Sequence, residues 1–230
     1  MTTGDGVRGA DIPDSRGRTG LHRAGLDLDR NPDVVVRDVA VTSDGWHVLR
    51  RTTFDYRRRS GEWVTQERET YDRGNGATIL LYDPERRMVL LAKQFRFSVY
   101  VNGHADGMLI ETAAGLLDSD DPETAIRREA SEEVGVAVGE MQHVFNAYMS
   151  PGSVTERLHF FAAPYSARDR GAGGGLEAEG EDIEVLEVPV DEALAMTRDG
   201  RITDGKTIML LQWAVLDGPF ARARPGGDGR

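Results

Sequence analysis

Cysteine is absent from this chain of 230 residues, and it has neither a long apolar run nor an excess of positive charge. The missing cysteine excludes a disulfide framework, thiolate catalysis and a cysteine-ligated zinc site. No apolar run approaches the roughly 18 residues that a membrane helix needs, and the N-terminus lacks the apolar core of a signal peptide. We therefore expect a cytoplasmic protein with no membrane partner.

The net charge of −11 makes nucleic acid an unfavourable partner, because phosphate backbones are bound through basic surfaces. An anionic substrate remains compatible with this charge, since metal ions and local arginines can reverse the field inside a cleft. Lysine is also scarce, because Lys93 and Lys206 are the only lysines among the 28 basic residues.

Composition divides the chain into four parts. Residues 1–33 have few large apolar side chains and no periodicity, which predicts a disordered tail. Residues 34–72 indicate three strands of an antiparallel β unit, which is too thin to stand alone and must pack on the main domain or on another chain. Residues 73–218 form the main domain, and residues 219–230 a C-terminal tail.

Within the main domain, short apolar runs indicate strands at residues 77–82, 88–95, 108–113, 144–149, 157–163 and 183–188. Helices are expected at residues 191–198 and 205–216, the second stopped by Gly218 and Pro219. A Gly/Glu-rich loop fills residues 166–182, which is long for a compact domain. Strands interleaved with a few helices, after a β appendage, fit an α/β/α sandwich.

An acidic stretch between Gly115 and Val136 organises the chain. Asp121 suits the N-cap of a helix, Pro122 suits its first turn, and Gly135 suits the position after its last turn. These signals predict a helix over the residues between them.

Three glutamates of this helix, Glu129, Glu132 and Glu133, are spaced i, i+3 and i+4, which places their carboxylates on one face. Like charges at this spacing repel, so helix formation does not call for them. A hard cation does, because Mg²⁺ takes carboxylate oxygens together with phosphate oxygens. We expect the apolar side chains on the opposite face. A solvated acidic surface is the alternative interpretation.

The order R-E-A-S-E-E-V-G-V over Arg128–Val136 resembles the second half of the Nudix signature. Six further stretches resemble the GDP-mannose pyrophosphatase branch of the Nudix superfamily, a close relative of the ADP-ribose pyrophosphatases. They are Tyr71–Gly76, Gln94–Arg96, Val101–Gly103, Ala113–Asp118, Tyr148–Gly152 and Asp204–Thr207. The resemblance extends from Asp38 to Leu216.

This resemblance implies a Nudix α/β/α sandwich with an N-terminal antiparallel β appendage. It implies a homodimer in which the N-terminal strands of one subunit cross to help form the nucleotide pocket of the other. The implied chemistry is Mg²⁺-dependent hydrolysis of a pyrophosphate bond, with Mn²⁺ as the alternative cation. GDP-mannose and water would give GMP and mannose 1-phosphate.

The resemblance also implies a set of metal ligands. Glu129, Glu133 and the backbone carbonyl of Ala114 would bind the cation, and Glu132 would bind it directly or through water. Arg128 would orient a glutamate by a salt bridge rather than touch the substrate.

The implied substrate contacts lie along the whole chain. Arg96 would contact the diphosphate, Trp46 would lie against the nucleobase, and Glu156 would lie near the substrate. The remaining contacts are Glu67, Arg68 and Glu69 on the strand that meets base and ribose, and Gly115 and Leu116 after the metal-binding carbonyl. Core packing is the alternative for Trp46, and a surface position is the alternative for Arg96.

Lys206 has an additional argument from within the chain. A sequence that uses arginine almost everywhere keeps a lysine in D-G-K-T, which indicates that a compact ammonium group is needed there. We expect Lys206 to contact the substrate; an incidental position at the start of a helix is the alternative.

Glu181 matches the loop acid that joins the metal site of the family and acts as general base. Glu177 and Glu179 compete with it, because the loop is long, and a disordered acidic loop is the alternative. Its glycines would give the loop backbone freedom until substrate and metal arrive.

Two other functions remain open. The first is hydrolysis of ADP-ribose or of another nucleoside diphosphate sugar, since base specificity depends on contacts that the sequence does not display. The second is a Nudix-derived binding or regulatory protein without catalysis, which the complete glutamate set disfavours.

Overall fold

The structure, a computed structural model, describes residues 18–21, 28, 30–166, 168, 170–176, 178 and 180–221. The chain divides into two compact units. The N-terminal unit comprises residues up to Gly76, together with Leu116–Asp121 and Ala147–Leu158. The main unit comprises Ala77–Gly115, Pro122–Asn146 and the residues from His159 onwards.

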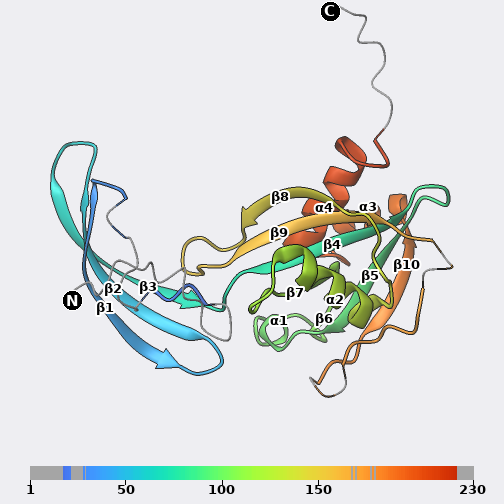
Figure 1. Cartoon of the computed structure of the whole chain (residues 1–230), viewed down its shortest axis with the longest axis horizontal. Helices are drawn as coiled ribbons and strands as arrows, with labels where there is room; N and C mark the ends of the chain where they lie inside the picture. The colour runs from blue at the N-terminus through green and yellow to red at the C-terminus, as the bar shows by residue number, and fades with distance from the viewer. Residues whose placement is uncertain are drawn as a thin grey trace, which may run out of the picture. The chain divides into compact units, whose positions relative to one another are not determined.

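A three-stranded antiparallel sheet forms most of the N-terminal unit (Figure 1). Its strands follow chain order as β1 (Val34–Asp44), β2 (Val48–Arg57) and β3 (Trp63–Asp72). The three strands expected here are confirmed, although Trp46 and His47 lie in the bend before β2. β1 contains no buried residue, and β3 buries only Asp72. The sheet is therefore as thin as the sequence predicted.

The N-terminal unit also includes two segments that the sequence assigned to the main domain. The backbone N–H of Tyr71 donates to the carbonyl of Ser153 (2.7 Å), and the N–H of Thr155 donates to the carbonyl of Tyr71 (3.1 Å). The N–H of Leu117 likewise donates to the carbonyl of Asn75 (3.0 Å). These backbone hydrogen bonds join distant stretches of chain, which local periodicity cannot reveal.

A buried ion pair between Arg50 and Asp72 lies at the centre of the N-terminal unit. Both side chains are fully buried, and Arg50 Nη1 lies 2.5 Å from Asp72 Oδ2. The backbone N–H of Gly74 and the hydroxyl of Thr155 donate to Asp72 Oδ1 at 3.2 and 3.1 Å. Asp72 thus connects β2, the end of β3 and the loop of Thr155 through one carboxylate.

Part of the expected N-terminal tail is bound to this carboxylate. The N–H and the hydroxyl of Thr19 donate to Asp72 Oδ2 at 3.1 and 2.8 Å. Arg18 is 7% exposed and pairs with Asp44 at 2.8 Å. The prediction of a disordered tail over residues 1–33 is therefore wrong for Arg18 and Thr19. Their partners lie 26 and 53 residues away, so composition gave no sign of them.

The second sheet has seven strands. Five run in the order β10-β5-β4-β9-β8, while β6 pairs with β5 and β7 pairs with β4. Their bounds are β4 (Gly76–Asp83), β5 (Met88–Phe95), β6 (Met108–Glu111), β7 (Ala113–Leu116), β8 (Gln142–Tyr148), β9 (Arg157–Pro164) and β10 (Glu184–Pro189). β4 and β5 are buried at most positions, as expected for central strands covered on both faces.

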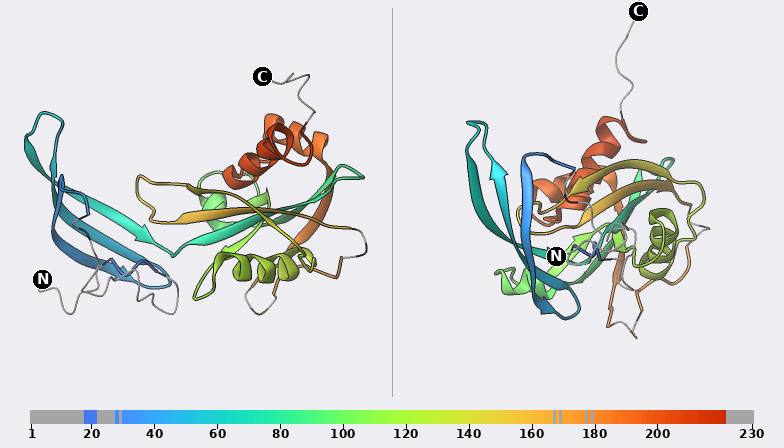
Figure 2. Two further views of the ribbon diagram at one scale, coloured as in Figure 1. Left: turned by 45° about the horizontal axis from the view of Figure 1, so that its top comes forward. Right: turned by 60° about the vertical axis from the view of Figure 1, so that its left-hand side comes forward.

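Helices lie on both faces of this sheet. α2 (Pro122–Val134) covers one face, and α3 (Val190–Asp199) and α4 (Gly205–Leu216) cover the other (Figure 2). Asp204 caps α4 by accepting a hydrogen bond from the N–H of Thr207 (3.0 Å). The predicted α/β/α sandwich with an N-terminal antiparallel β appendage is confirmed.

One helix was not predicted. α1 (Phe97–Val101) is a single turn without a buried residue, and no helix is predicted there from the sequence. A segment of five residues is too short to show helical periodicity, and its aromatic and β-branched side chains favour strands.

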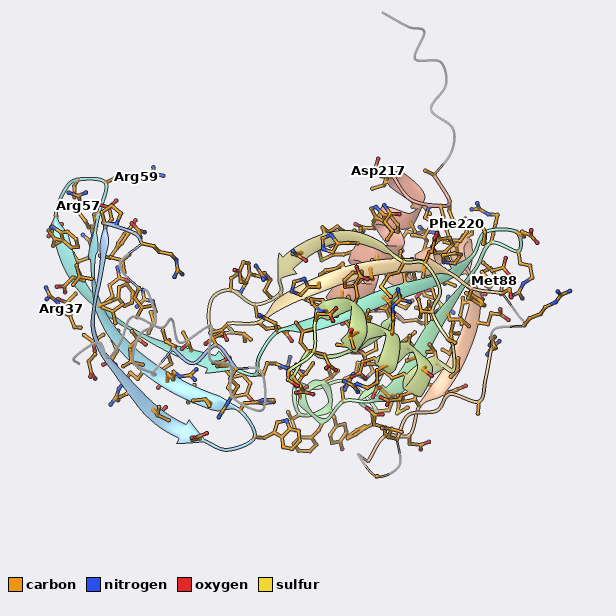
Figure 3. The ribbon with its side chains drawn as sticks, viewed as in Figure 1. Arg37, Arg57, Arg59, Met88, Asp217 and Phe220 are labelled. Carbon is orange, nitrogen blue, oxygen red and sulfur yellow. The ribbon has the colours of Figure 1, made fainter. Side chains whose placement is uncertain are left out.

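The C-terminal boundary also differs from the prediction. Phe220, labelled in Figure 3, was assigned to the tail but is 5% exposed. Its ring lies 5.9 Å from that of Tyr82, and its N–H donates to the carbonyl of Ala214 (2.8 Å). Phe220 therefore belongs to the core, and the expected tail beyond Ala221 lies outside the described residues.

We predict that Asp72→Asn lowers the free energy of unfolding by about 3–5 kcal/mol, because it removes the carboxylate that compensates the buried charge of Arg50. Burial pushes the pKa of Asp72 upward, but Thr19 and Arg50 outweigh it and hold this pKa below its usual 3.8. The stabilisation is therefore complete above pH 3.8 and is lost as the pH falls through the lower folded-state value.

Chemical denaturation of the wild type and Asp72→Asn between pH 2 and pH 7 measures this difference. Glu62→Gln is the control, because Glu62 is exposed and should change stability by no more than about 0.5 kcal/mol. Equal stability of Asp72→Asn and the wild type at pH 7 would contradict the role of this ion pair.

Candidate active site

The acidic helix α2 places its three glutamates at different depths. The side chains of Glu132, Glu129 and Glu133 are 26%, 13% and 2% exposed. Glu133 lies seven residues after the buried Ile126, which puts both on the same face after two turns. The expectation that all three acids lie opposite the apolar face is therefore wrong for Glu133.

The carboxylate of Glu133 is held by two donors. Its Oε2 accepts from the backbone N–H of Ala114 at 3.0 Å, and its Oε1 accepts from Gln94 Nε2 at 3.3 Å. Burial raises the pKa of Glu133 to about 8, and the nearby charges of Glu111 and Glu129 push it in the same direction. The site thus crowds negative charge in a place that water reaches poorly.

Glu129 lies against β7, the strand that contains Ala114. A Cβ atom added to Gly115 would lie 2.1 Å from the carboxyl carbon of Glu129, so only glycine leaves room for this carboxylate. Arg128 Nη2 pairs with Glu129 at 3.0 Å, and its Nη1 pairs with Glu132 at 3.1 Å. Arg128 therefore orients glutamates, as expected.

The chemistry of these residues fits a hard divalent cation. Glu129 and Glu133 bring carboxylate oxygens to Ala114 and Gly115, the stretch whose carbonyl was predicted to bind metal. Within the described ranges, no three histidine, aspartate or glutamate side chains converge closely enough to form a complete metal site. The carboxylate of Glu132 accepts a hydrogen bond from Arg128 Nη1.

Arg96 and Lys206 meet at a carboxylate that sequence reasoning missed. Glu111 ends β6 and is 2% exposed, with its Oε1 2.7 Å from Arg96 Nε. Its Oε2 pairs with Lys206 Nζ, which also lies 3.1 Å from Asp204 Oδ1. The available signal was a single acid at the end of the apolar run M-L-I-E.

The glycines of the loop after β9 pack against the C-terminal end of α2. The N–H groups of Gly174 and Gly175 each donate at 3.0 Å to the carbonyls of Glu133 and Glu132, which the helix itself leaves unpaired. A Cβ atom on Gly173 would lie 2.8 Å from the backbone carbon of Val134. Gly173 therefore permits close approach, and Gly173, Gly174 and Gly175 all have positive φ angles that other residues rarely adopt.

Glu181 lies on the returning part of this loop. Its Oε2 accepts from the backbone N–H of Leu176 at 2.9 Å, and a Cβ atom on Gly175 would lie 2.8 Å from the same oxygen. The structure thus brings Glu181 beside Gly175, whose backbone N–H donates to the backbone carbonyl of Glu132. Its competitors Glu177 and Glu179 lie outside the described residues.

The N-terminal unit contains a cavity of about 630 Å³ between β2, β3 and the loop of residues 151–155. The predicted contacts Arg68 and Glu69 line it. Thr52 and Thr70 also line it, and their buried hydroxyl oxygens have no hydrogen-bond partner within the described part of the chain.

The other predicted contacts of the N-terminal unit lie outside this lining. Glu67 pairs with Arg51 at 3.8 Å, and Glu156 pairs with Arg73 at 3.6 Å. Trp46 is 77% exposed, so its side chain is not packed in the core of a single chain, which was the alternative to a nucleobase contact. Leu116 ends β7 and is half-buried.

Comparisons with known proteins agree with these features. The family model described as "GDP-mannose pyrophosphatase NudK N-terminal domain" matches residues 33–71, and the model "NUDIX domain" matches residues 72–211. A GDP-mannose pyrophosphatase from Pectobacterium atrosepticum is 58% identical over 182 residues, which cover 78% of this chain and 93% of that protein.

A GDP-mannose pyrophosphatase from an Enterobacter species is 52% identical over 188 residues, covering 81% of this chain and 97% of that protein. The crystal structure of an ADP compounds hydrolase matches with a TM-score of 0.60 over 81% of this chain and 97% of its own. At 14% identity, this last likeness concerns the fold alone.

The chain therefore belongs to the Nudix family. Within that family it lies in the GDP-mannose pyrophosphatase branch, which confirms the resemblance of the acidic helix and its flanking motifs. No helix in the described part of the chain is long and apolar enough to cross a membrane.

We predict that Gly173→Ala destabilises the protein more than Gly180→Ala. Both glycines have left-handed backbone angles, with φ of 57° and 77°, so alanine costs about 1–2 kcal/mol at either position. Only the new Cβ at position 173 meets backbone, and at position 180 nothing lies within 4 Å. We expect an additional loss of about 1–3 kcal/mol for Gly173→Ala, measured by chemical denaturation. Equal losses would show that the loop does not pack on α2.

Proposed function

We propose that this protein hydrolyses the pyrophosphate bond of a nucleotide sugar, with GDP-mannose as the preferred substrate. The observation that carries the proposal is the pair of carboxylates, Glu129 and Glu133, against the backbone of Ala114 and Gly115. The substrate follows from the relatives that are more than 50% identical and are described as GDP-mannose pyrophosphatases. In this reaction, water attacks one phosphorus and the anhydride P–O bond breaks, giving GMP and mannose 1-phosphate.

Glu129, Glu133 and the carbonyl of Ala114 would hold the cation, with Glu132 as a further ligand. Mg²⁺ is the expected ion and Mn²⁺ the alternative; when bound, it would offset phosphate charge and acidify the attacking water. Arg128 orients Glu129 and Glu132 through its two terminal nitrogens. Gly115 provides the space that Glu129 occupies.

Arg96 and Lys206 would bind the diphosphate. Both are cations in the unit that carries α2, and Lys206 is 13% exposed, so its charge acts with little screening by water. Their contribution is to place the anhydride and to stabilise charge that develops on its oxygens.

The N-terminal unit would bind the nucleoside. Its cavity is lined by Arg68 and Glu69, whose side chains can meet polar edges of a base or ribose. Trp46, with its largely exposed ring, offers a stacking surface. Glu67, Glu156, Gly115 and Leu116 remain predicted contacts.

A panel of nucleotide sugars with Mg²⁺ or Mn²⁺, with products separated by chromatography, tests the function. We expect GMP and mannose 1-phosphate from GDP-mannose at a higher kcat/KM than for any other substrate. A preference for ADP-ribose would favour the alternative specificity. Absence of hydrolysis with every substrate would favour a binding protein.

We further propose a homodimer in which the N-terminal strands of one subunit complete the nucleotide site of the other. β1 has no buried residue, so none of its side chains belongs to a core among the described residues. Phe97 and Val101 of α1 are 68% and 63% exposed, and adjacent exposed apolar side chains mark interaction surfaces. Light scattering at micromolar concentration should give twice the chain mass of 25.3 kDa. An active species at 25.3 kDa would exclude this arrangement.

We predict that Glu129→Gln and Glu133→Gln each lower kcat by at least about 100-fold while the fold survives, because each removes a metal-binding carboxylate. Glu123→Gln is the matched control, since Glu123 lies in the first turn of the same helix and is exposed. Thermal melting and Mg²⁺-dependent turnover are measured on all three. Normal turnover in a folded Glu133→Gln protein would end the metal assignment.

We predict that Glu181→Gln lowers kcat at least tenfold, which corresponds to about 1.4 kcal/mol of barrier. The reason is that Glu181 is anchored between Leu176 and β10 and would act as the loop base. Glu177→Gln and Glu179→Gln should each cost much less. Steady-state kinetics that rank either of those two as the costly change would reassign the base.

A further inference from the structure

Glu111 holds both cations that the proposed function assigns to the diphosphate. Its two oxygens are divided between them: Oε1 accepts from Arg96 Nε at 2.7 Å, and Oε2 accepts from Lys206 Nζ. Arg96 precedes α1, and Lys206 lies in the first turn of α4. One buried carboxylate therefore fixes the relative position of two cations that come from different elements.

Glu111 is itself held in place. It pairs with Ala92 of β5 in the sheet, and the N–H of the next residue, Thr112, donates to the hydroxyl of Thr207 at 2.7 Å. The same hydroxyl donates to Asp204 Oδ2 at 2.6 Å, so the backbone after Glu111 is tied to the start of α4. A carboxylate with a fixed backbone can set the position of flexible cationic side chains.

The hydrogen bonds to Glu111 leave donors available on both cations. Among the described residues, the guanidinium of Arg96 donates to a side chain only through Nε, which leaves the fork of its two terminal nitrogens for a phosphate. Lys206 has three ammonium hydrogens and two carboxylate neighbours, Glu111 and Asp204. One hydrogen remains for a ligand.

We propose that Glu111 is a positioning residue that holds Arg96 and Lys206 as a two-cation clamp for the diphosphate of the substrate. The proposal rests on the proposed function and concerns how its diphosphate is bound. The clamp recognises any compound with two linked phosphates, whichever nucleoside and sugar it carries.

The test measures binding of inorganic pyrophosphate by calorimetry, with a chelator present so that only the protein's own cations contribute. Glu111→Gln keeps the size of the side chain and removes its charge. We expect its dissociation constant for pyrophosphate to rise about 10- to 100-fold, by analogy with the loss of a residue that orients a metal ligand. With Mg²⁺ and GDP-mannose, KM should rise by a similar factor.

Glu187→Gln is the matched control. Glu187 is also a carboxylate of the main unit that holds two cations, Arg86 and Arg170, and none of its partners was assigned to the substrate. A purely structural role for Glu111 predicts that both variants lose thermal stability and bind pyrophosphate with wild-type affinity. That outcome would overturn the proposal.

Glu111→Asp and a double-mutant cycle decide the matter if Glu111→Gln does not fold. Arg96→Gln is introduced into the wild type and into Glu111→Asp, and pyrophosphate affinity is compared. If Glu111 acts through Arg96, the two effects are not additive, whereas independent effects would contradict the proposal. Pyrophosphate binding does not depend on the sugar or the base, so a failed substrate panel leaves this result interpretable.

Discussion

The buried carboxylate of Glu133 constrains the structure of the main unit around it. An ionised group that water does not reach is unfavourable unless donors or cations surround it, and here Ala114 and Gln94 provide two neutral donors. Glu111 and Glu129 add negative charge nearby. The negative charge around Glu133 therefore favours the approach of a positive charge. A hard cation, Arg96 or a proton can provide it.

Close approach of the backbone to the acidic helix α2 and its side chains is also required around this site. Gly115 makes room for Glu129, and Gly173 allows the loop after β9 to reach the end of α2. The last carbonyls of α2 are then paired with the N–H groups of Gly174 and Gly175. The acidic helix is thus fixed at both its side chains and its C-terminal end before any ligand binds.

Local patterns in the sequence predicted most of the fold and the identity of the acidic helix. The three N-terminal strands, the central strands and the helix from Gly205 follow from periodicity and capping residues, which depend on neighbours in the chain. Glu111, Thr19 and the depth of Glu133 could not be predicted in this way. Each depends on a partner that is distant in sequence, such as Lys206, 95 residues from Glu111, and only folding brings such pairs together.

The scarcity of lysine has a practical consequence for chemical labelling. Lys93 is 35% exposed beside Glu184, whereas Lys206 is 13% exposed between Glu111 and Asp204, which raise its pKa against the effect of burial. Acylating reagents attack neutral, accessible amines, so they would modify Lys93 and spare Lys206 in the folded protein. Acylation of Lys206, detected by mass spectrometry, would therefore report opening of the site. Lys93 is the one other lysine side chain that the reagent would modify.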